Sequence, residues 1–180
     1  MDQSARKRTC FFLGTRFSQL FFGPESSDNR NIQLKACLST AIFDIAARGV
    51  RHFRCGLQIG TDIWCAEAVL ALRREHPEWR IKLHILLPYP GYGEKMGMEY
   101  QQRRARILAE ADEVCHLDDR RWGNSVLNRY RLMAEQSGHL IMVENNLFPH
   151  SFEARTLAYA KRLGVDCVCI RPWLSGFGRT

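Results

Sequence analysis

Short apolar runs alternate with longer amphipathic runs along the whole chain, and this alternation restricts the fold more than any other feature. Runs of strand length occupy residues 9–14, 52–56, 81–87, 113–117, 139–143 and 166–170. Helical spacing of apolar residues marks residues 38–49, 60–76, 100–111, 125–137 and 152–163. Parallel strands need a crossover between them. The pattern predicts an α/β fold, a Rossmann-like three-layer α/β/α sandwich with a mainly parallel sheet of about six strands and the first strand central.

Length and composition are those of an ordinary globular protein. The chain has 180 residues, of which 46% are hydrophobic and 25% charged, so we expect one domain spanning residues 1–180. The most apolar stretch, residues 81–89, is interrupted by Lys82 and His84 and is too short to cross a bilayer. The first residues lack a signal-peptide core. We therefore expect a cytoplasmic protein without a membrane partner.

The 7 cysteines lie mostly inside apolar runs and lack the paired loop spacing of a disulfide framework. They are interpreted as reduced, buried thiols. Cys167 and Cys169 share one face of a predicted strand, but no further cysteine or histidine nearby completes a ligand set, so no metal site is predicted.

The chain carries a formal net charge of +7, which is compatible with a polyanionic partner such as nucleic acid or a phosphorylated small molecule. Arg103, Arg104 and Arg106 form a local basic cluster, but acidic residues share the same predicted helix. A solvated helix face is therefore the preferred interpretation of this cluster.

Small and polar residues follow several of the predicted strands. Open parallel sheets bind ligands in the crevice outside the carboxyl ends of their strands. Gly14, Thr15 and Arg16 follow the first strand and combine a turn without a side chain, a hydroxyl and a guanidinium, which together suit a phosphate. The alternative is a strand end with a surface arginine. Pro88 ends the third strand.

The second helix opens at Gly60, Thr61 and Asp62, where free backbone N–H groups attract anions. Asp62 would repel a phosphate there, so it is assigned to ribose hydroxyls or to helix capping. Glu67 lies farther along the same helix and could bind or activate a hydroxyl. Arg129, in the fourth helix, is a candidate anchor for an anion or for backbone, or a surface arginine.

A long connection, residues 15–29, follows the first strand and contains Phe17, Phe21 and Phe22. We weigh a lid or a dimer contact against rings that pack on the core. The chain has no Walker A loop, no GxGxxG after the first strand and no nucleophile elbow. It therefore presents no complete catalytic motif.

These segments resemble the SLOG superfamily, and within it the YpsA-like proteins of unknown function. Residues 56–67 are similar to the family's Gly-x-x-x-Gly-x-Asp-x-x-Ala-Glu segment, and Gly14-Thr15-Arg16 resembles its Thr-Gly-x-Arg strand end with the order altered. Pro88 matches the proline after the third strand.

The fourth and last helices extend the resemblance. Arg129, Met133 and Ser137 resemble an Arg-Asn-x-x-Met-x-x-x-Ser helix, with Tyr130 in place of the second residue. Ser151-Phe152-Glu153 stands where the family commonly has Gly-Gly-Thr at the start of the last helix. This departure implies either a loss of phosphate binding or a different ligand.

The resemblance implies a Rossmann-like domain that binds a nucleotide or a nucleotide-derived ligand such as ADP-ribose, without establishing turnover. One alternative is N-glycosidic hydrolysis, as in the LOG-type phosphoribohydrolases, with Glu67 or Asp62 as the carboxylate. The other is binding of single-stranded nucleic acid, as in DprA. A homodimer or higher homo-oligomer is also expected from the resemblance.

Overall fold

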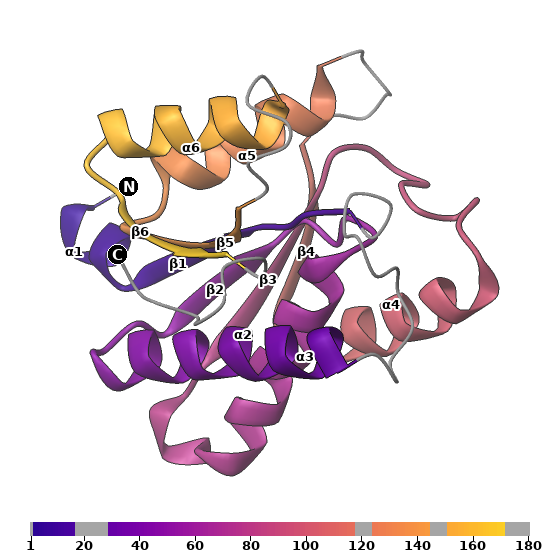
Figure 1. Ribbon diagram of the computed structural model, residues 1–180, viewed down its shortest axis with the longest axis horizontal. Helices are drawn as coiled ribbons and strands as arrows, with labels where there is room; N and C mark the ends of the chain where they lie inside the picture. Colours follow the sequence, from indigo (N-terminus) through magenta and orange to yellow (C-terminus); the bar gives the residue numbers. More distant parts are fainter. Residues whose placement is uncertain (1, 17–28, 118–123, 145–150, 172–180) are drawn as a thin grey trace.

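A computed structural model describes residues 2–16, 29–117, 124–144 and 151–171 of the chain. Six parallel strands form one sheet in the order β4-β3-β2-β1-β5-β6 (Figure 1). The strands are β1 (Thr9–Leu13), β2 (His52–Cys55), β3 (Lys82–Leu87), β4 (Glu113–His116), β5 (His139–Val143) and β6 (Asp166–Ile170). The predicted fold class and the central position of the first strand are confirmed.

Helices cover both faces of the sheet. Figure 1 shows α5 and α6 on one face and α2, α3 and α4 on the other. Their bounds are α2 (Asn29–Ala47), α3 (Thr61–Glu75), α4 (Met98–Glu110), α5 (Ser125–Glu135) and α6 (Phe152–Arg162). Two shorter elements, α1 (Gln3–Lys7) and the 3-10 helix η2 (Pro77–Trp79), precede β1 and β3. Each strand is therefore connected to the next through a helix, as parallel pairing requires.

The side chains of β1 divide between two apolar layers, because successive residues of a strand point to opposite faces. Cys10 and Phe12 belong to the layer shared with α2, α3 and α4, while Phe11 and Leu13 belong to the layer shared with α5 and α6. All four side chains are buried. A strand covered on both faces has no polar position, which explains its continuous apolar sequence.

The helix after β1 begins earlier than predicted. Its expected start was Leu38, whereas α2 begins at Asn29. Asn31 and Leu34 are buried and continue the helical spacing toward the amino terminus. The polar residues between them obscured this face in the sequence. Residues 17–22, which were considered as a lid or dimer contact, lie outside the described residues.

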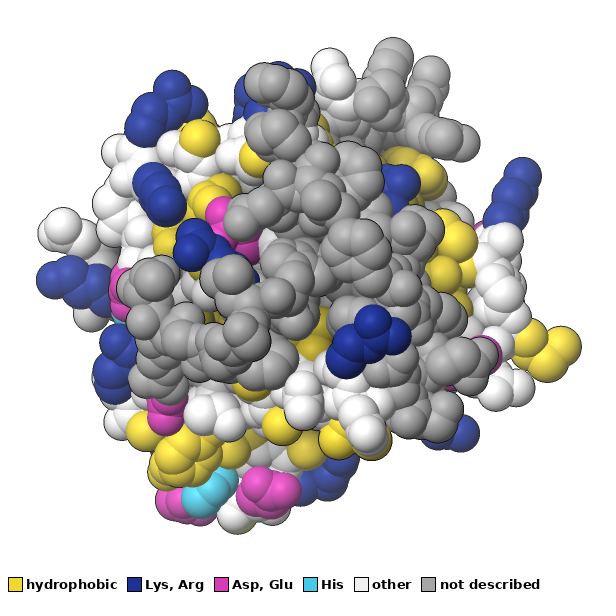
Figure 2. Space-filling model, in the orientation of Figure 1, with side chains coloured by type: hydrophobic (Ala, Val, Ile, Leu, Met, Phe, Trp, Pro, Cys, Tyr) yellow, Lys and Arg dark blue, Asp and Glu magenta, His cyan; other side chains and the backbone are white. Residues whose placement is uncertain are grey.

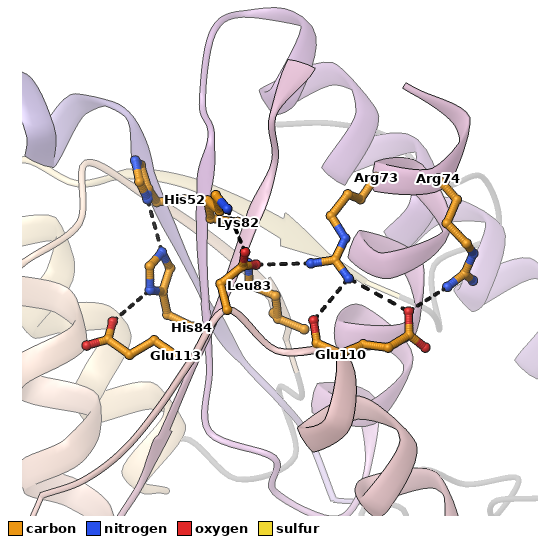
Figure 3. A network of polar contacts seen from close by, with 9 residues as sticks. His52, Arg73, Arg74, Lys82, Leu83, His84, Glu110 and Glu113 are labelled. Atoms are coloured by element: carbon orange, nitrogen blue, oxygen red, sulfur yellow. Dashed lines mark hydrogen bonds and ion pairs between the residues drawn. The ribbon is translucent and has the colours of Figure 1, made fainter. Parts of the chain in front are cut away.

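A network of polar contacts joins β2, β3 and β4 (Figure 3). His52 Nδ1 lies 3.0 Å from His84 Nε2, and His84 Nδ1 lies 2.8 Å from Glu113 Oε2. At the amino ends of β3 and β4, Asp112 accepts hydrogen bonds from Arg73, Lys82 and the backbone N–H of Leu83. These contacts account for both histidines as links between strands.

The cysteines are less uniformly buried than predicted. All seven are free thiols, but only Cys10, Cys55 and Cys65 are fully buried, and Cys115 is exposed because β4 is an edge strand. Within the described ranges there is no cluster of three or more His, Cys, Asp or Glu side chains arranged to hold a metal. Among those same residues, no helix is long and apolar enough to span a membrane.

The strand order places a topological switch point between β1 and β5. From β1 the chain continues through α2 toward β2 on one side, whereas from β5 it continues through α6 toward β6 on the other. The helices that follow these neighbouring strands lie on opposite faces of the sheet (Figure 1). In open α/β sheets, the crevice at such a point is the preferred ligand site.

Candidate functional site

The turn after β1 and the turn before α3 are joined by reciprocal hydrogen bonds at the carboxyl edge of the sheet. The Thr15 backbone N–H donates to Thr61 Oγ1 at 2.8 Å, and the Thr61 N–H donates to the Thr15 carbonyl oxygen at 3.0 Å. Gly60 has φ 137°, and a Cβ there would meet the Thr15 oxygen and lie 2.8 Å from Arg16 Cα. Glycine at position 60 is therefore required for this close backbone approach.

Thr15 also connects the two strands of the switch point. Its hydroxyl donates to the carbonyl oxygen of Val143, the last residue of β5, at 2.7 Å. Thr15 is almost fully buried, so its hydroxyl is a structural group at this position. One residue thus holds together β1, β5 and the start of α3.

Asp62 lies completely buried beneath this turn, in the first turn of α3. Its Oδ2 accepts hydrogen bonds from the Gln58 backbone N–H at 3.1 Å and from the Tyr130 hydroxyl at 3.3 Å. A Cβ at Gly14 would meet Oδ1 and lie 2.8 Å from the carboxyl carbon. The Asp62 carboxylate therefore occupies the space beside Gly14 and holds the preceding turn closed. The predicted helix-capping role is wrong, because the N-cap of α3 is Gly60, which has no side chain to cap the helix.

The turn between β2 and α3 has an unusual backbone. Leu57 is buried and has φ 49°, a conformation that non-glycine residues seldom adopt. Its carbonyl oxygen accepts a hydrogen bond from the Tyr100 hydroxyl at 2.5 Å, which ties the turn to α4. Backbone strain of this kind persists where the surrounding structure fixes it, and it is concentrated at functional sites.

Burial raises the pKa of Asp62 from 3.8 to about 6, although the positive charge of Arg129 and the hydrogen bonds from Gln58 and Tyr130 lower it. The native protein therefore binds a proton more tightly than the unfolded chain does. Between pH about 4 and 6, the free energy of unfolding should fall as pH rises, by up to about 3 kcal/mol from this group.

This pH dependence is testable with Asp62→Asn, which removes the titrating group at nearly constant volume. We expect the free energy of unfolding of the wild type, relative to Asp62→Asn, to fall by about 2.5 kcal/mol between pH 4 and pH 7. Urea unfolding of both proteins across this range measures it. A difference between them that does not vary with pH would contradict the assignment.

Arg129 is also completely buried, and it links α5 to the end of β2. Its Nη1 donates to the Gly56 carbonyl oxygen at 2.7 Å, and its guanidinium lies over the Tyr130 ring at 4.4 Å and near the Tyr92 ring at 5.4 Å. A Cβ at Gly56 would lie 2.5 Å from the guanidinium carbon. These contacts make Arg129 a backbone anchor, which is one of the roles considered from the sequence. Its burial rules out a surface arginine.

The remaining predicted site residues lie in three different environments. Arg16 is exposed at the end of β1. Pro88 is buried directly after β3. Glu67 forms a two-pronged ion pair with Arg103 of α4, at 2.7 and 2.6 Å. Because Glu67 lies five residues after Asp62, it is about 140° away around α3. The structure therefore brings Arg16 to the switch point and leaves Glu67 outside it.

Several residues of this site were not predicted. The sequence did not single out Tyr92, and it marked Tyr130 only as a departure from the family's helix motif. Gln58 accepts a hydrogen bond from Tyr130 at 3.1 Å and is almost fully buried. The signal available in the sequence was the position of Gln58 between two glycines and of Tyr130 beside Arg129. Contacts between residues so far apart in sequence leave no local pattern.

The fold and the joined turns define a Rossmann-like α/β protein with a candidate ligand site at its switch point. A family model described as the YspA SLOG family matches residues 11–171. The chain belongs to this family, and the resemblance drawn from its motifs is confirmed.

Curated relatives carry the name UPF0398 protein. One from Bacillus velezensis is 27% identical over 88 residues, which are 49% of this chain and 47% of the relative. One from Staphylococcus epidermidis is 24% identical over 115 residues, 61% of this chain and 60% of the relative. One from Brevibacillus brevis is 35% identical over 57 residues, 32% of this chain and 29% of the relative. The chain thus spans less than two thirds of each of these relatives.

Proposed function

We propose that this protein binds a nucleotide-derived small molecule at the carboxyl ends of β1 and β5. The observation that carries the proposal is the joining of the β1 turn to the start of α3 at the switch point, through Thr15 and Thr61, with the exposed Arg16 beside it. This is the crevice where open α/β sheets bind ligands. A guanidinium at its mouth suits phosphate oxygens.

The arrangement supports binding more than N-glycosidic hydrolysis. Such hydrolysis needs a carboxylate that can reach a sugar or a water molecule. Glu67 is held by Arg103 through both of its oxygens, and Asp62 is enclosed with 0% of its surface exposed. Glu67 is thus paired away from the switch point, and Asp62 Oδ2 accepts two hydrogen bonds from the protein, so we assign to Asp62 the role of holding the turn.

A small molecule is also favoured over single-stranded nucleic acid. On the face shown in Figure 2, the visible Lys and Arg side chains of the described residues lie in several separate places. Arg73 and Arg74 of α3 are paired with acidic side chains, and Arg103 is paired with Glu67. A nucleic-acid groove would need free cations along one track.

A thermal-shift screen tests the proposal. Nucleosides, nucleoside monophosphates, ADP-ribose and dinucleotides are added to the purified protein, because a ligand that binds only the folded state raises its melting temperature. We expect at least one to raise it by about 4 °C or more at saturation. A flat response across the panel, together with salt-sensitive binding of a single-stranded oligonucleotide, would replace the proposal with nucleic-acid binding.

A further inference from the structure

The amino terminus of α6 faces the same crevice, because α6 follows β5 and β5 pairs with β1. Ser151 caps this helix by accepting a hydrogen bond from the Ala154 backbone N–H at 3.1 Å. Phe152 stacks on the Tyr130 ring with 5.6 Å between centroids. Tyr130 in turn donates to Asp62, so the first turn of α6 is fixed onto the buried part of the site.

Glu153 lies in this first turn and is an unusual residue to bury. Only 7% of its surface is exposed, and its Oε1 is buried without a hydrogen-bond partner among the described residues. Buried polar atoms in native proteins are nearly always paired, and an unpaired one needs an explanation. A missing partner supplied by a ligand is such an explanation.

The surroundings of the Glu153 carboxyl group locate it at the end of the helix. Burial raises its pKa, while its own backbone N–H, the Ser151 hydroxyl and the positive charge of Arg16 lower it. Glu153 is the second residue of α6, so its side chain belongs to the amino-terminal turn of this helix. A helix amino terminus is an anion-binding position, and here the chain supplies the anion itself.

We propose that Glu153 excludes phosphate from the α6 side of the site and accepts a hydrogen bond there from a ligand hydroxyl or amino group. Any anionic group of the ligand then lies at Arg16. The ligand class is a nucleoside-like molecule that presents its sugar hydroxyls to α6. This inference rests on the proposed function, because it specifies the ligand of the same site.

Glu153→Gln tests the inference, since it removes the negative charge and keeps the shape. Glu75→Gln is the control, because it removes the same charge from an exposed position at the far end of α3. Glu153→Ala serves as a second variant if the glutamine protein does not fold. The first probe is inorganic phosphate, exchanged for chloride at constant ionic strength while the melting temperature is measured.

We expect phosphate to raise the melting temperature of Glu153→Gln by about 2–4 °C more than that of the wild type or of Glu75→Gln. The second probe is a set of ribonucleosides and their 5′-monophosphates, titrated by calorimetry. Here Glu153→Gln should shift the ratio of the two affinities toward the monophosphate by about tenfold. The monophosphate gains because its repulsion by the carboxylate is removed, and the nucleoside loses because its hydroxyl no longer meets a charged acceptor.

Equal phosphate responses in all three proteins would overturn the inference, as would an unchanged preference between nucleoside and monophosphate. The two proposals fail separately. If no nucleoside or nucleotide binds the wild type, the proposed function is wrong. The phosphate response of Glu153→Gln then still shows whether Glu153 excludes phosphate from the amino terminus of α6.

Discussion

Replacing Arg129 by methionine is expected to lower the free energy of unfolding by about 3–5 kcal/mol at pH 8, one of the two largest effects in this protein. The side chain is completely buried, and methionine keeps most of its volume. The change leaves the Gly56 carbonyl oxygen without its donor and removes the positive charge that favours an ionised Asp62. Urea unfolding followed by circular dichroism measures the loss.

The matched control is Arg131→Met on the same helix, where the side chain is exposed. We expect this change to alter the free energy of unfolding by less than about 0.5 kcal/mol. The penalty at Arg129 should also shrink at pH 5, because Asp62 then takes up a proton and no longer needs the opposite charge. Equal, small effects at the two positions would show that Arg129 does not anchor α5 to β2.

Gly60→Ala is expected to destabilise the protein by about 3 kcal/mol or more. Two costs combine there. The backbone has φ 137°, and the added Cβ would meet the Thr15 carbonyl oxygen and lie 2.8 Å from Arg16 Cα. Both obstacles are backbone atoms, so neither can move without opening the joined turns. For a chain of this size, the loss corresponds to a fall of about 6–12 °C in melting temperature.

Gly49→Ala separates the two costs. Gly49 also has positive φ, at 100°, but nothing lies within 4 Å of the position that its Cβ would take. We expect it to cost about 1 kcal/mol, from the backbone conformation alone. If the two substitutions are equally destabilising, the close approach of residues 15 and 60 is not a tight constraint, and the shape of the site would have to be reconsidered.

The fold was predictable because its determinants are local. Each buried strand carries a continuous apolar run, and each helix carries an apolar face, so their alternation specifies a parallel sheet with crossovers. Glycine and polar residues at the strand ends also marked the edge of the sheet where Thr15, Thr61 and Asp62 make their contacts. The start of α2 was misplaced by nine residues, from Leu38 to Asn29, because a buried asparagine at position 31 does not look like a core residue.

The site was only partly predictable, because its contacts join distant parts of the chain. The sequence singled out Asp62 and Arg129, but not that both are enclosed with Tyr130 between them. Glu67 is a carboxylate on the same helix as Asp62, so the sequence alone also made it a plausible site residue. Its pairing with Arg103 depends on how α4 packs on α3, which no local pattern specifies.

At Ser151-Phe152-Glu153, the chain differs from the Gly-Gly-Thr that the family commonly has at the start of the last helix. From the sequence, this segment implied either a lost phosphate site or a different ligand. In the structure, Phe152 packs against Tyr130, and Glu153 is buried at the start of α6 with a free oxygen. This packing is the basis on which we propose a different ligand, and the phosphate response of Glu153→Gln tests it.

The central claim, that the ligand lies at the carboxyl ends of β1 and β5, is tested most directly by titrating the screened ligand into Arg16→Ala and Arg8→Ala. The two exposed arginines stand at opposite ends of β1, so the pair distinguishes the edges of the sheet. We expect calorimetry to show an affinity about tenfold weaker for Arg16→Ala and unchanged for Arg8→Ala. Weaker binding by Arg8→Ala with full binding by Arg16→Ala would place the ligand at the other edge and contradict the account.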